Sequence, residues 1–263
     1  MPKQEEPRPA RIVRLILGDQ LNHAHNWFAQ PRADALHVMM EVRQETDYAW
    51  HHIQKVLGFF GAMRKFAEHL RTQGHRVLYL TLDDPRNQQD IPKNLAWVID
   101  ACKAKTFAYQ LPDEWRLDQQ LKAFSAKCSC AVEVADTEHY LTARNELATL
   151  FKGKKQYLME RFYRVMRERT GLLMRGDQPE GDRWNFDQDN RNRPPKDHVP
   201  PPPLLFDHEL CDIKAMLQRA GVYTIGTVDA QHFPWPLDRA EGLQLLHYSA
   251  NIYSIDSAPT RMP

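Results

Sequence analysis

The sequence is short of glycine, and the glycines that it has do not form a phosphate-binding loop. Of 263 residues, 11 are glycine and 18 are proline. No segment carries G-x-G-x-x-G or G-x-x-x-x-G-K-[ST], so a backbone cradle for nucleotide phosphates is not indicated. The G-x-S-x-G turn of many serine hydrolases is absent as well. These absences remove the strongest local signatures of nucleotide binding and of serine hydrolysis.

Cysteine is rare as well, the net charge is close to zero, and the apolar runs are short. The Cys128-Ser-Cys130 spacing is too tight for a structural zinc pair, and with Cys102 and Cys211 the chain still lacks thiolates at a spacing compatible with an iron–sulfur cluster. With 35 basic and 34 acidic residues the net charge is +1, so nucleic-acid binding would need a local basic patch. No apolar run approaches the roughly 20 residues that span a membrane, and the polar N-terminus is no secretory signal. We expect a cytoplasmic protein with reduced thiols and no membrane association.

Histidine does not supply the missing metal ligands. The pairs His51-His52 and His23-x-His25 are the only close spacings that invite such an interpretation. Adjacent residues of a helix point about 100° apart, so two of them cannot share one ion without help. We therefore expect no metal site.

Apolar segments of strand length alternate with amphipathic helices over the first half of the chain. This alternation is typical of βαβ units and predicts an α/β fold with a doubly wound, mostly parallel sheet. Right-handed crossovers would place helices on both faces. The expected strands cover residues 11–17, 35–41, 76–82, 106–110 and 130–134, and the expected helices cover 51–72, 91–103 and 114–126.

The alternation stops after about residue 136, and the rest of the chain predicts a helical and extended arm. Residues 194–203 include six prolines, which favour an extended, semi-rigid spacer. Gly171 is placed as a helix C-cap. The arm is too small for a core of its own, so it must pack on the first domain or on something else. Its expected helices cover residues 142–151, 156–169, 207–220 and 237–248.

Three loops compete for a ligand site, namely residues 18–20, 41–48 and 110–115. Ligands of open parallel sheets bind at the carboxyl ends of the strands, where the strand order reverses. The loops carry carboxylates and aromatic side chains, which suit an uncharged aromatic heterocycle with N–H and hydroxyl donors. A second interpretation stays open, in which Asp19 and Asp113 are turn or cap residues and the aromatic side chains belong to the core.

Residues 152–193 are locally basic, with 11 basic and seven acidic side chains and interleaved aromatic residues. Cations beside aromatic rings are what a phosphate backbone and unstacked bases require. An amphipathic helix whose aromatic side chains face a core explains the pattern equally well. The candidate DNA contacts are Arg161, Arg164 and Arg183.

Six motifs, in this order, give the sequence a family resemblance. They closely resemble the N-terminal half of the deoxyribodipyrimidine photolyase-related proteins, which include iron–sulfur bacterial cryptochromes and prokaryotic (6-4) photolyases. The resemblance covers about residues 11–248. The motifs are L-G-D-Q-L at 17–21, E-x3-E-x2-Y-x2-H-H at 41–52, A-M-R-x-F-A at 62–67, F-Y-R-x-M-R at 162–167, T-G-L-L-M at 170–174 and W-N-F-D at 184–187.

The resemblance implies a Rossmann-like antenna domain over residues 11–136, an interdomain segment over 137–235, and the first helix of an FAD-binding domain over 236–263. In the family, the antenna domain binds 6,7-dimethyl-8-ribityllumazine and passes excitation energy to FAD. The helical domain holds FAD and a 4Fe–4S cluster, and the reduced, excited flavin repairs (6-4) photoproducts in DNA. By motif, the lumazine pocket would use Asp19, Met40, Glu45 and Tyr48, with Glu41 and Trp115 as weaker candidates.

The end of the sequence departs from the family pattern. Residues 249–263 do not resemble the family's next segment, and the four cysteines do not match the cluster ligands. Gln110 stands where related sequences tend to carry an acid beside the pocket. We expect a truncated, monomeric antenna portion of a (6-4) photolyase-like flavoprotein, not catalytic alone, without the FAD and cluster sites and with weak or no DNA binding. The alternatives are a fragment of a signalling cryptochrome and a non-functional remnant without chromophore.

Overall fold

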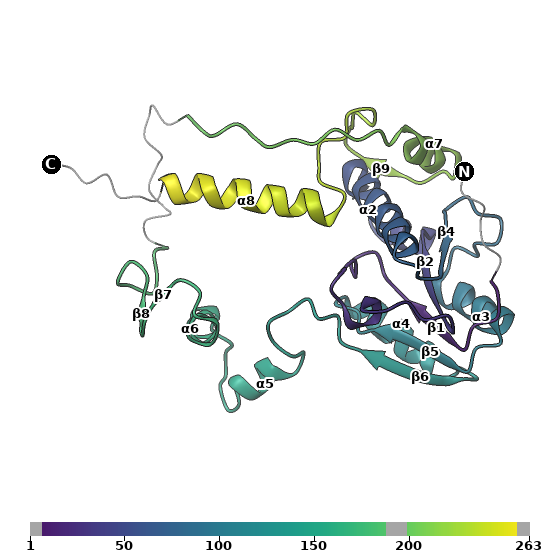
Figure 1. The fold of residues 1–263 in the computed structure, drawn as a ribbon, viewed down its shortest axis with the longest axis horizontal. Helices are drawn as coiled ribbons and strands as arrows, with labels where there is room; N and C mark the ends of the chain where they lie inside the picture. Colours follow the sequence, from purple (N-terminus) through teal and green to yellow (C-terminus); the bar gives the residue numbers. More distant parts are fainter. Residues whose placement is uncertain (1–6, 188–198, 257–263) are drawn as a thin grey trace. The chain divides into compact units, whose positions relative to one another are not determined.

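The computed structural model describes residues 7–187 and 199–256, which fall into two compact units. The first contains the described residues of Met1–His139 and Pro203–Pro263, and the second contains those of Tyr140–Pro202. Figure 1 labels their helices and strands. Each unit is described by itself below.

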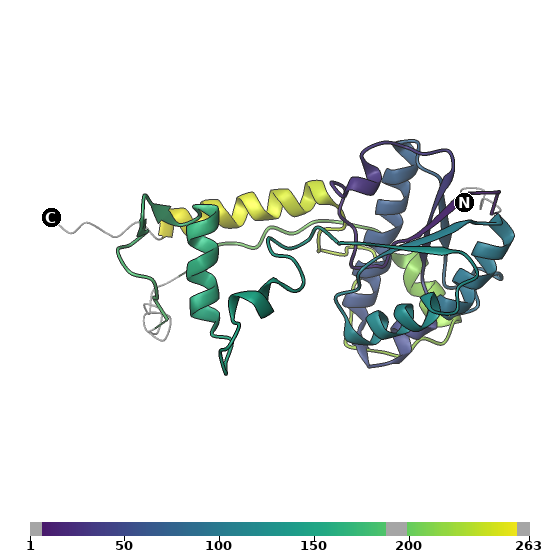
Figure 2. The ribbon, with the colours of Figure 1, turned by 90° about the horizontal axis from the view of Figure 1, so that it is seen from below.

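A five-stranded parallel sheet organises the first unit, in the order β4-β2-β1-β5-β6 (Figures 1 and 2). The chain fills the sheet outward from β1 in one direction, then crosses back to fill the other side. This is the doubly wound α/β arrangement that the sequence predicts. The strands are β1 (Ile12–Leu15), β2 (Ala35–Met40), β4 (Val77–Leu80), β5 (Thr106–Gln110) and β6 (Ala131–Ala135).

Helices cover both faces of this sheet and enclose two apolar cores. On one face α2 (Ile53–Thr72) packs against the sheet, and α7 (Cys211–Arg219) packs against α2. On the other face lie α3 (Ile91–Cys102) and α4 (Trp115–Ser125). All six residues of β2 are buried, because a central parallel strand with helices on both sides exposes neither face.

Several short elements escape prediction from periodicity. The expected helix at residue 51 begins two residues later, because His51–His52 form β3, which pairs in parallel with β9 (Thr224–Ile225). His52 then caps α2, with its Nδ1 accepting from the Gln54 N–H at 3.2 Å. A 3-10 helix, η1 (Asn26–Phe28), and the one-turn helix α1 (Arg43–Asp47) complete this part of the unit.

The last helix of the first unit, α8 (Arg239–Asp256), is longer than the predicted 237–248. Its start is fixed to α2, because Lys65 Nζ donates to Asp238 Oδ2 at 3.0 Å and to Glu241 Oε1 at 3.3 Å. Asp238 caps the helix by accepting from the Glu241 N–H at 3.0 Å. Across residues 7–187 and 199–256, no helix combines the length and the apolar character needed to cross a membrane.

The second unit is small and mostly helical. It contains α5 (Glu146–Leu150), α6 (Met159–Thr170) and a hairpin of β7 (Met174–Arg175) and β8 (Gln178–Pro179). Gly171 ends α6 with φ of 71°, as predicted, since a left-handed C-cap favours glycine. Of the predicted proline spacer at 194–203, residues 194–198 lie outside the described residues, and 199–203 form neither helix nor strand.

A buried histidine in β2 makes the first unit sensitive to acid. The charged and titratable groups around His37 are Arg14, His75 and His25. Burial first, then the charge of Arg14, lowers the pKa of His37 to about 3. His37 is therefore neutral in the fold, whereas an unfolded histidine takes up its proton near pH 6.5. The unfolded chain binds more protons as the pH falls below that value, so stability is lost from about pH 6.5 toward pH 3.

We predict that His37→Leu removes part of this acid sensitivity. The loss of unfolding free energy between pH 7 and pH 5 should be smaller by about 2 kcal/mol than in the wild type. Urea denaturation at the two pH values measures it. His247→Leu, at an exposed histidine of α8, is the matched control and should keep the full loss. An equal loss in His37→Leu and in the wild type would contradict the assignment.

Candidate functional site

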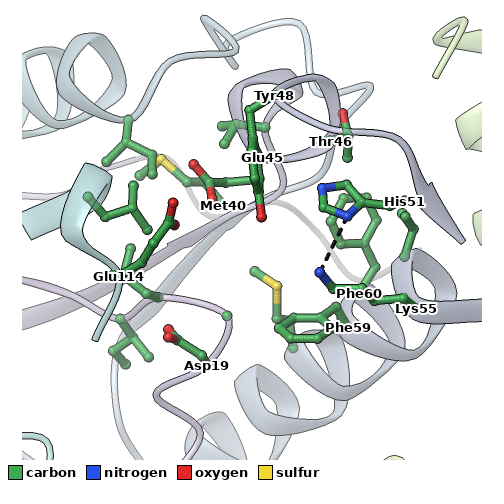
Figure 3. Close-up of a pocket in the computed structure, with 18 of the residues that line it drawn as sticks. Asp19, Met40, Glu45, Thr46, Tyr48, His51, Lys55, Phe59, Phe60 and Glu114 are labelled. Carbon is green, nitrogen blue, oxygen red and sulfur yellow. Dashed lines mark hydrogen bonds between the residues drawn. The ribbon is translucent and has the colours of Figure 1, made fainter. Parts of the chain in front are cut away.

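A cavity of about 310 Å³ opens at the carboxyl edge of the sheet, where the strand order reverses between β1 and β5 (Figure 3). The loop after β1 contributes Gly18 and Asp19, the loop after β2 contributes Glu45 and Tyr48, and the segment after β5 contributes Glu114. The three loops that the sequence singles out thus meet around one cavity.

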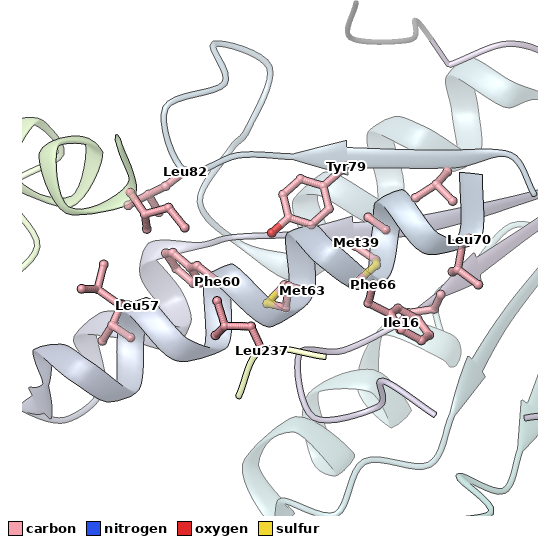
Figure 4. Packing of buried hydrophobic residues seen from close by; sticks show 14 of the residues in the cluster. Ile16, Met39, Leu57, Phe60, Met63, Phe66, Leu70, Tyr79, Leu82 and Leu237 are labelled. Atoms are coloured by element: carbon pink, nitrogen blue, oxygen red, sulfur yellow. The ribbon is translucent and has the colours of Figure 1, made fainter. Parts of the chain in front are cut away.

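The remaining wall of the cavity is the helix α2. Its residues Phe59, Phe60 and Met63 line the space, and the same helix continues as the apolar core against the sheet (Figure 4). The loop after β1 packs so closely on this helix that a Cβ at Gly18 would lie 2.9 Å from Met63 Sδ. Glycine at position 18 therefore allows the loop after β1 to pack closely against α2.

All four residues predicted from the family motifs line this cavity, namely Asp19, Met40, Glu45 and Tyr48. Met40 is buried at the end of β2, whereas Tyr48 is 51% exposed at the rim. Asp19 remains accessible to solvent, but the protein packed around its carboxyl group raises its pKa, and the negative charges of Asp113 and Glu45 add to this effect. Whether the four residues hold a ligand stays a prediction.

Arg116, which was not predicted from the sequence, links two carboxylates at the rim of the cavity. Arg116 donates to both carboxylate oxygens of Glu45 at 2.9 and 2.8 Å, and to both of Glu114 at 2.9 Å. Its guanidinium also lies over the Tyr48 ring, 4.3 Å from the centroid. The hydrogen bonds to Glu45 are the main cause that raises the pKa of Arg116. Arg116 thus joins the loop after β2 to the start of α4 and fixes the direction of the Glu45 carboxylate.

The opposite side of the cavity carries nitrogen groups. His51, from β3, and Lys55, from the first turns of α2, face the carboxylates of Asp19, Glu45 and Glu114 across the cavity (Figure 3). Lys55 Nζ lies 3.3 Å from His51 Nδ1. From the sequence, His51 is considered as a metal ligand and as part of a family motif, and Lys55 is not among the candidates.

The two weaker candidates do not line the cavity. Glu41 is buried beneath it, where it accepts from Arg64 Nε at 2.7 Å, the Tyr79 hydroxyl at 2.7 Å and the Leu82 N–H at 3.0 Å. Trp115 is 73% exposed and is not one of the lining residues. The alternative that the loop aromatic residues belong to the core fails for Trp115 and for Tyr48, which are both exposed.

The basic residues of the second unit lie beside aromatic rings. Arg164 and Arg167 stack over Trp184, at 5.3 and 5.2 Å from its centroid, and Arg183 stacks over Phe186 at 4.2 Å. Arg161 is exposed on α6. A hollow of about 470 Å³ lies next to these rings. Two of the three predicted DNA contacts thus share an aromatic surface, while Arg161 stands on the same helix as Arg164.

The described residues assemble no cluster of metal ligands. No group of three or more His, Cys, Asp or Glu side chains within them is placed to hold a metal ion. Cys102 is buried, Cys211 is exposed, and Cys128 and Cys130 lie together with their sulfur atoms 3.3 Å apart. This donor set does not fit a four-cysteine cluster.

Comparison with known proteins relates the chain to a family and to a characterised relative. The family model described as deoxyribodipyrimidine photo-lyase-related protein matches residues 14–233. A (6-4) photolyase from Agrobacterium fabrum (strain C58 / ATCC 33970) is 36% identical over 194 residues, which are 73% of this chain. The aligned part is 38% of that relative's length, so the chain spans well under half of the protein it is similar to.

Gln110, which the sequence analysis placed beside the pocket, ends β5 but does not line the cavity. Its side chain is fully buried, and neither Nε2 nor Oε1 has a hydrogen-bond partner among residues 7–187 and 199–256. Its backbone oxygen accepts from Gln20 Nε2 at 3.2 Å. An unpaired buried amide destabilises a fold by about 1–3 kcal/mol.

We therefore predict that Gln110→Met raises the free energy of unfolding by about 1 kcal/mol, because methionine keeps the length and removes the unpaired groups. Urea denaturation measures it. The control is Asn94→Met, since Asn94 is equally buried but bonds to Asn87 and Gln88 and should lose stability when replaced. A destabilised Gln110→Met would show that the amide is paired after all.

Proposed function

Because the chain belongs to the deoxyribodipyrimidine photo-lyase-related protein family, we propose that the cavity of its five-stranded unit binds 6,7-dimethyl-8-ribityllumazine as a light-harvesting chromophore. The observation that carries this proposal is the convergence of Asp19, Met40, Glu45 and Tyr48 on one cavity at the reversal point of the sheet. The family motifs identify these residues from the sequence alone. Their position around one cavity is a separate observation that supports the proposal.

The cavity fits the chemistry of such a ligand. Its volume, about 310 Å³, is within the range of small-molecule sites, and its walls are mainly apolar, as a flat ring requires. Met40 and Phe60 would contact the ring and exclude water from it. The carboxylates of Asp19 and Glu45 would accept hydrogen bonds from ribityl hydroxyls, with Arg116 holding Glu45 in place.

When bound, the lumazine would absorb light and pass its excitation energy to a flavin. We propose (6-4) photoproduct repair as the activity of the flavoprotein to which this antenna belongs, and blue-light signalling is the alternative. The two roles share the antenna, so the cavity favours neither. FAD and the 4Fe–4S cluster are implied by the family, and the described donor groups do not assemble a site for the cluster.

We predict saturable binding of 6,7-dimethyl-8-ribityllumazine by the purified chain and a loss of affinity in Glu45→Gln. The substitution removes charged hydrogen bonds worth about 1.5–3 kcal/mol, so the Kd should rise at least ~10-fold. Quenching of the lumazine fluorescence measures the affinity.

The matched control is Glu68→Gln, which neutralises an exposed glutamate of α2 that pairs with Arg71 away from the cavity. It should bind as the wild type does. Wild-type protein without saturable binding at tens of micromolar would contradict the proposed function.

We propose a second, weaker function for the other unit, which is contact with nucleic acid through Arg161, Arg164 and Arg183. The stacking of Arg164 on Trp184 and of Arg183 on Phe186 favours it, since ring faces flanked by cations bind unstacked bases and phosphates. Arg164 also pairs with Glu160, which reduces its free charge.

The expected result is weak, strongly salt-dependent binding to a labelled single-stranded oligonucleotide, followed by fluorescence anisotropy between 50 and 200 mM salt. Replacing Arg161, Arg164 and Arg183 by alanine should reduce the slope of log K against log salt by up to ~2. Replacing Lys93, Lys105 and Lys127 by alanine removes the same charge from exposed positions of the first unit and should leave the slope unchanged. Equal slopes in both triple variants would rule out the assigned surface.

A further inference from the structure

The segment Cys128-Ser-Cys130 has no role in either proposed function. It lies between the end of α4 at Ser125 and the start of β6 at Ala131 (Figure 1). All five strands of the sheet run in parallel, so the start of β6 is at the edge opposite to the cavity, whose lining contains neither cysteine. The chemistry of this pair of thiols is therefore independent of what the cavity binds.

The two thiols are in direct contact, and neither residue is sealed in the core. Cys128 Sγ lies 3.3 Å from Cys130 Sγ. Both side chains pack against the apolar core beneath α3 and α4, yet both residues remain partly exposed, whereas Cys102 is fully enclosed in the same core. A small reagent in solution can therefore approach Cys128 and Cys130 but not Cys102.

The distance between the sulfur atoms favours a bond between them over a shared metal ion. Tetrahedral zinc, with Zn–S of about 2.3 Å, holds two thiolates about 3.8 Å apart and needs further ligands. No group of three or more metal ligands is present in residues 7–187 and 199–256. A disulfide bond is about 2 Å long, so the two sulfur atoms need to approach by only about 1.3 Å. Residues 128–130 form neither helix nor strand, which leaves their side chains and backbone room to adjust.

The two thiols are not equivalent. Burial, followed by the hydrogen bond with Cys128, raises the pKa of Cys130 to about 11. Cys130 therefore keeps its proton at neutral pH and is the donor in the contact, with the sulfur of Cys128 as the acceptor. The attacking form of a cysteine carries no proton, so Cys128 is the better placed nucleophile.

We propose that Cys128 and Cys130 form a thiol–disulfide exchange site that reacts with small disulfides, for which oxidised glutathione is the probe. Cys128 loses its proton to solvent and attacks one sulfur atom of the reagent, so a mixed disulfide forms and one thiolate leaves. Cys130 then loses its proton and attacks the sulfur of Cys128, which closes the Cys128–Cys130 bond and releases the second thiolate. The two cysteines give up two electrons and two protons, and the reagent is reduced to two thiols.

The first step prepares the second. The hydrogen bond with Cys128 is one of the causes that keep the proton on Cys130, and it is lost once Cys128 is bound in the mixed disulfide. The closed loop contains only three residues, so the new bond constrains the unfolded chain little and adds little to stability. A small thiol should therefore reopen it.

Oxidised glutathione tests the site in the purified, fully reduced chain. Peptide mapping by mass spectrometry should find the segment with Cys128 and Cys130 lighter by two hydrogen atoms, and dithiothreitol should restore its mass. Cys211 is exposed and can react by itself, so the free thiols are counted in Cys211→Ser, which keeps three of the four cysteines. Their number should fall from three to one, and the thiol that remains should be the buried Cys102.

Two further serine variants test the order of attack. Cys130→Ser lacks the second nucleophile, so the reaction should stop at a stable glutathione adduct on Cys128. Cys128→Ser leaves the thiol that holds its proton and should take up glutathione at least ~10-fold more slowly. Circular dichroism should show the same fold in both variants.

The outcomes are separate from those for the chromophore site, because no step involves the cavity. A wild-type chain that stays reduced at both cysteines, or that carries glutathione on both without closing the bond, would overturn the proposal. Equal rates of adduct formation in Cys128→Ser and Cys130→Ser would overturn the assigned order of attack.

Discussion

The buried ion pair between Glu41 and Arg64 is the constraint on which the geometry of the first unit depends. Glu41, just after β2, is fully buried, and Arg64 reaches it from the middle of α2. Arg64 also donates to Asp212 of α7, and Tyr79 of β4 donates to Glu41. Removing one partner of such a pair leaves an uncompensated buried charge, a loss of about 3–5 kcal/mol. The pair thus fixes α2 over the end of the sheet, and with it the wall of the cavity and the position of Lys55.

In this arrangement two glutamates of one motif have different roles. Glu41 and Glu45 lie four residues apart in the same motif. Glu41 is buried in an ion pair with Arg64, whereas Glu45 lies at the rim of the cavity and accepts hydrogen bonds from Arg116. The fold neutralises both carboxylates with arginines and leaves Lys55 without a carboxylate partner in the described ion pairs.

The sequence predicts the sheet well and the cavity in part, for physical reasons. The five strands and the helices between them follow from local hydrophobic period, and the reversal point of the strand order selects the three loops that line the cavity. Arg116 and Lys55 could not be predicted in this way, because their contacts are defined only in the folded chain. Arg116 pairs with Glu45, 71 residues away, and Lys55 contacts His51, four residues away. Glu41 was misjudged because motif membership does not separate a core carboxylate from a rim carboxylate. The pairing of His51 with β9 could not be predicted either, because strands of two residues show no hydrophobic period.

The pairing of β3 with β9 can form only after the strands of the sheet have been synthesised, because β9 comes late in the sequence. His51 lies next to Thr224, and the ring of His52 packs against Gly226, so the nitrogen-bearing side of the cavity is braced by chain that is synthesised long after the sheet. The last strand of the sheet ends at Ala135, and a ribosome must still add 89 residues before Thr224 emerges. Contacts of such long sequence separation form late. The nascent chain thus builds the carboxylate side first, and any molecule that needs both sides must wait for the C-terminal third of the chain.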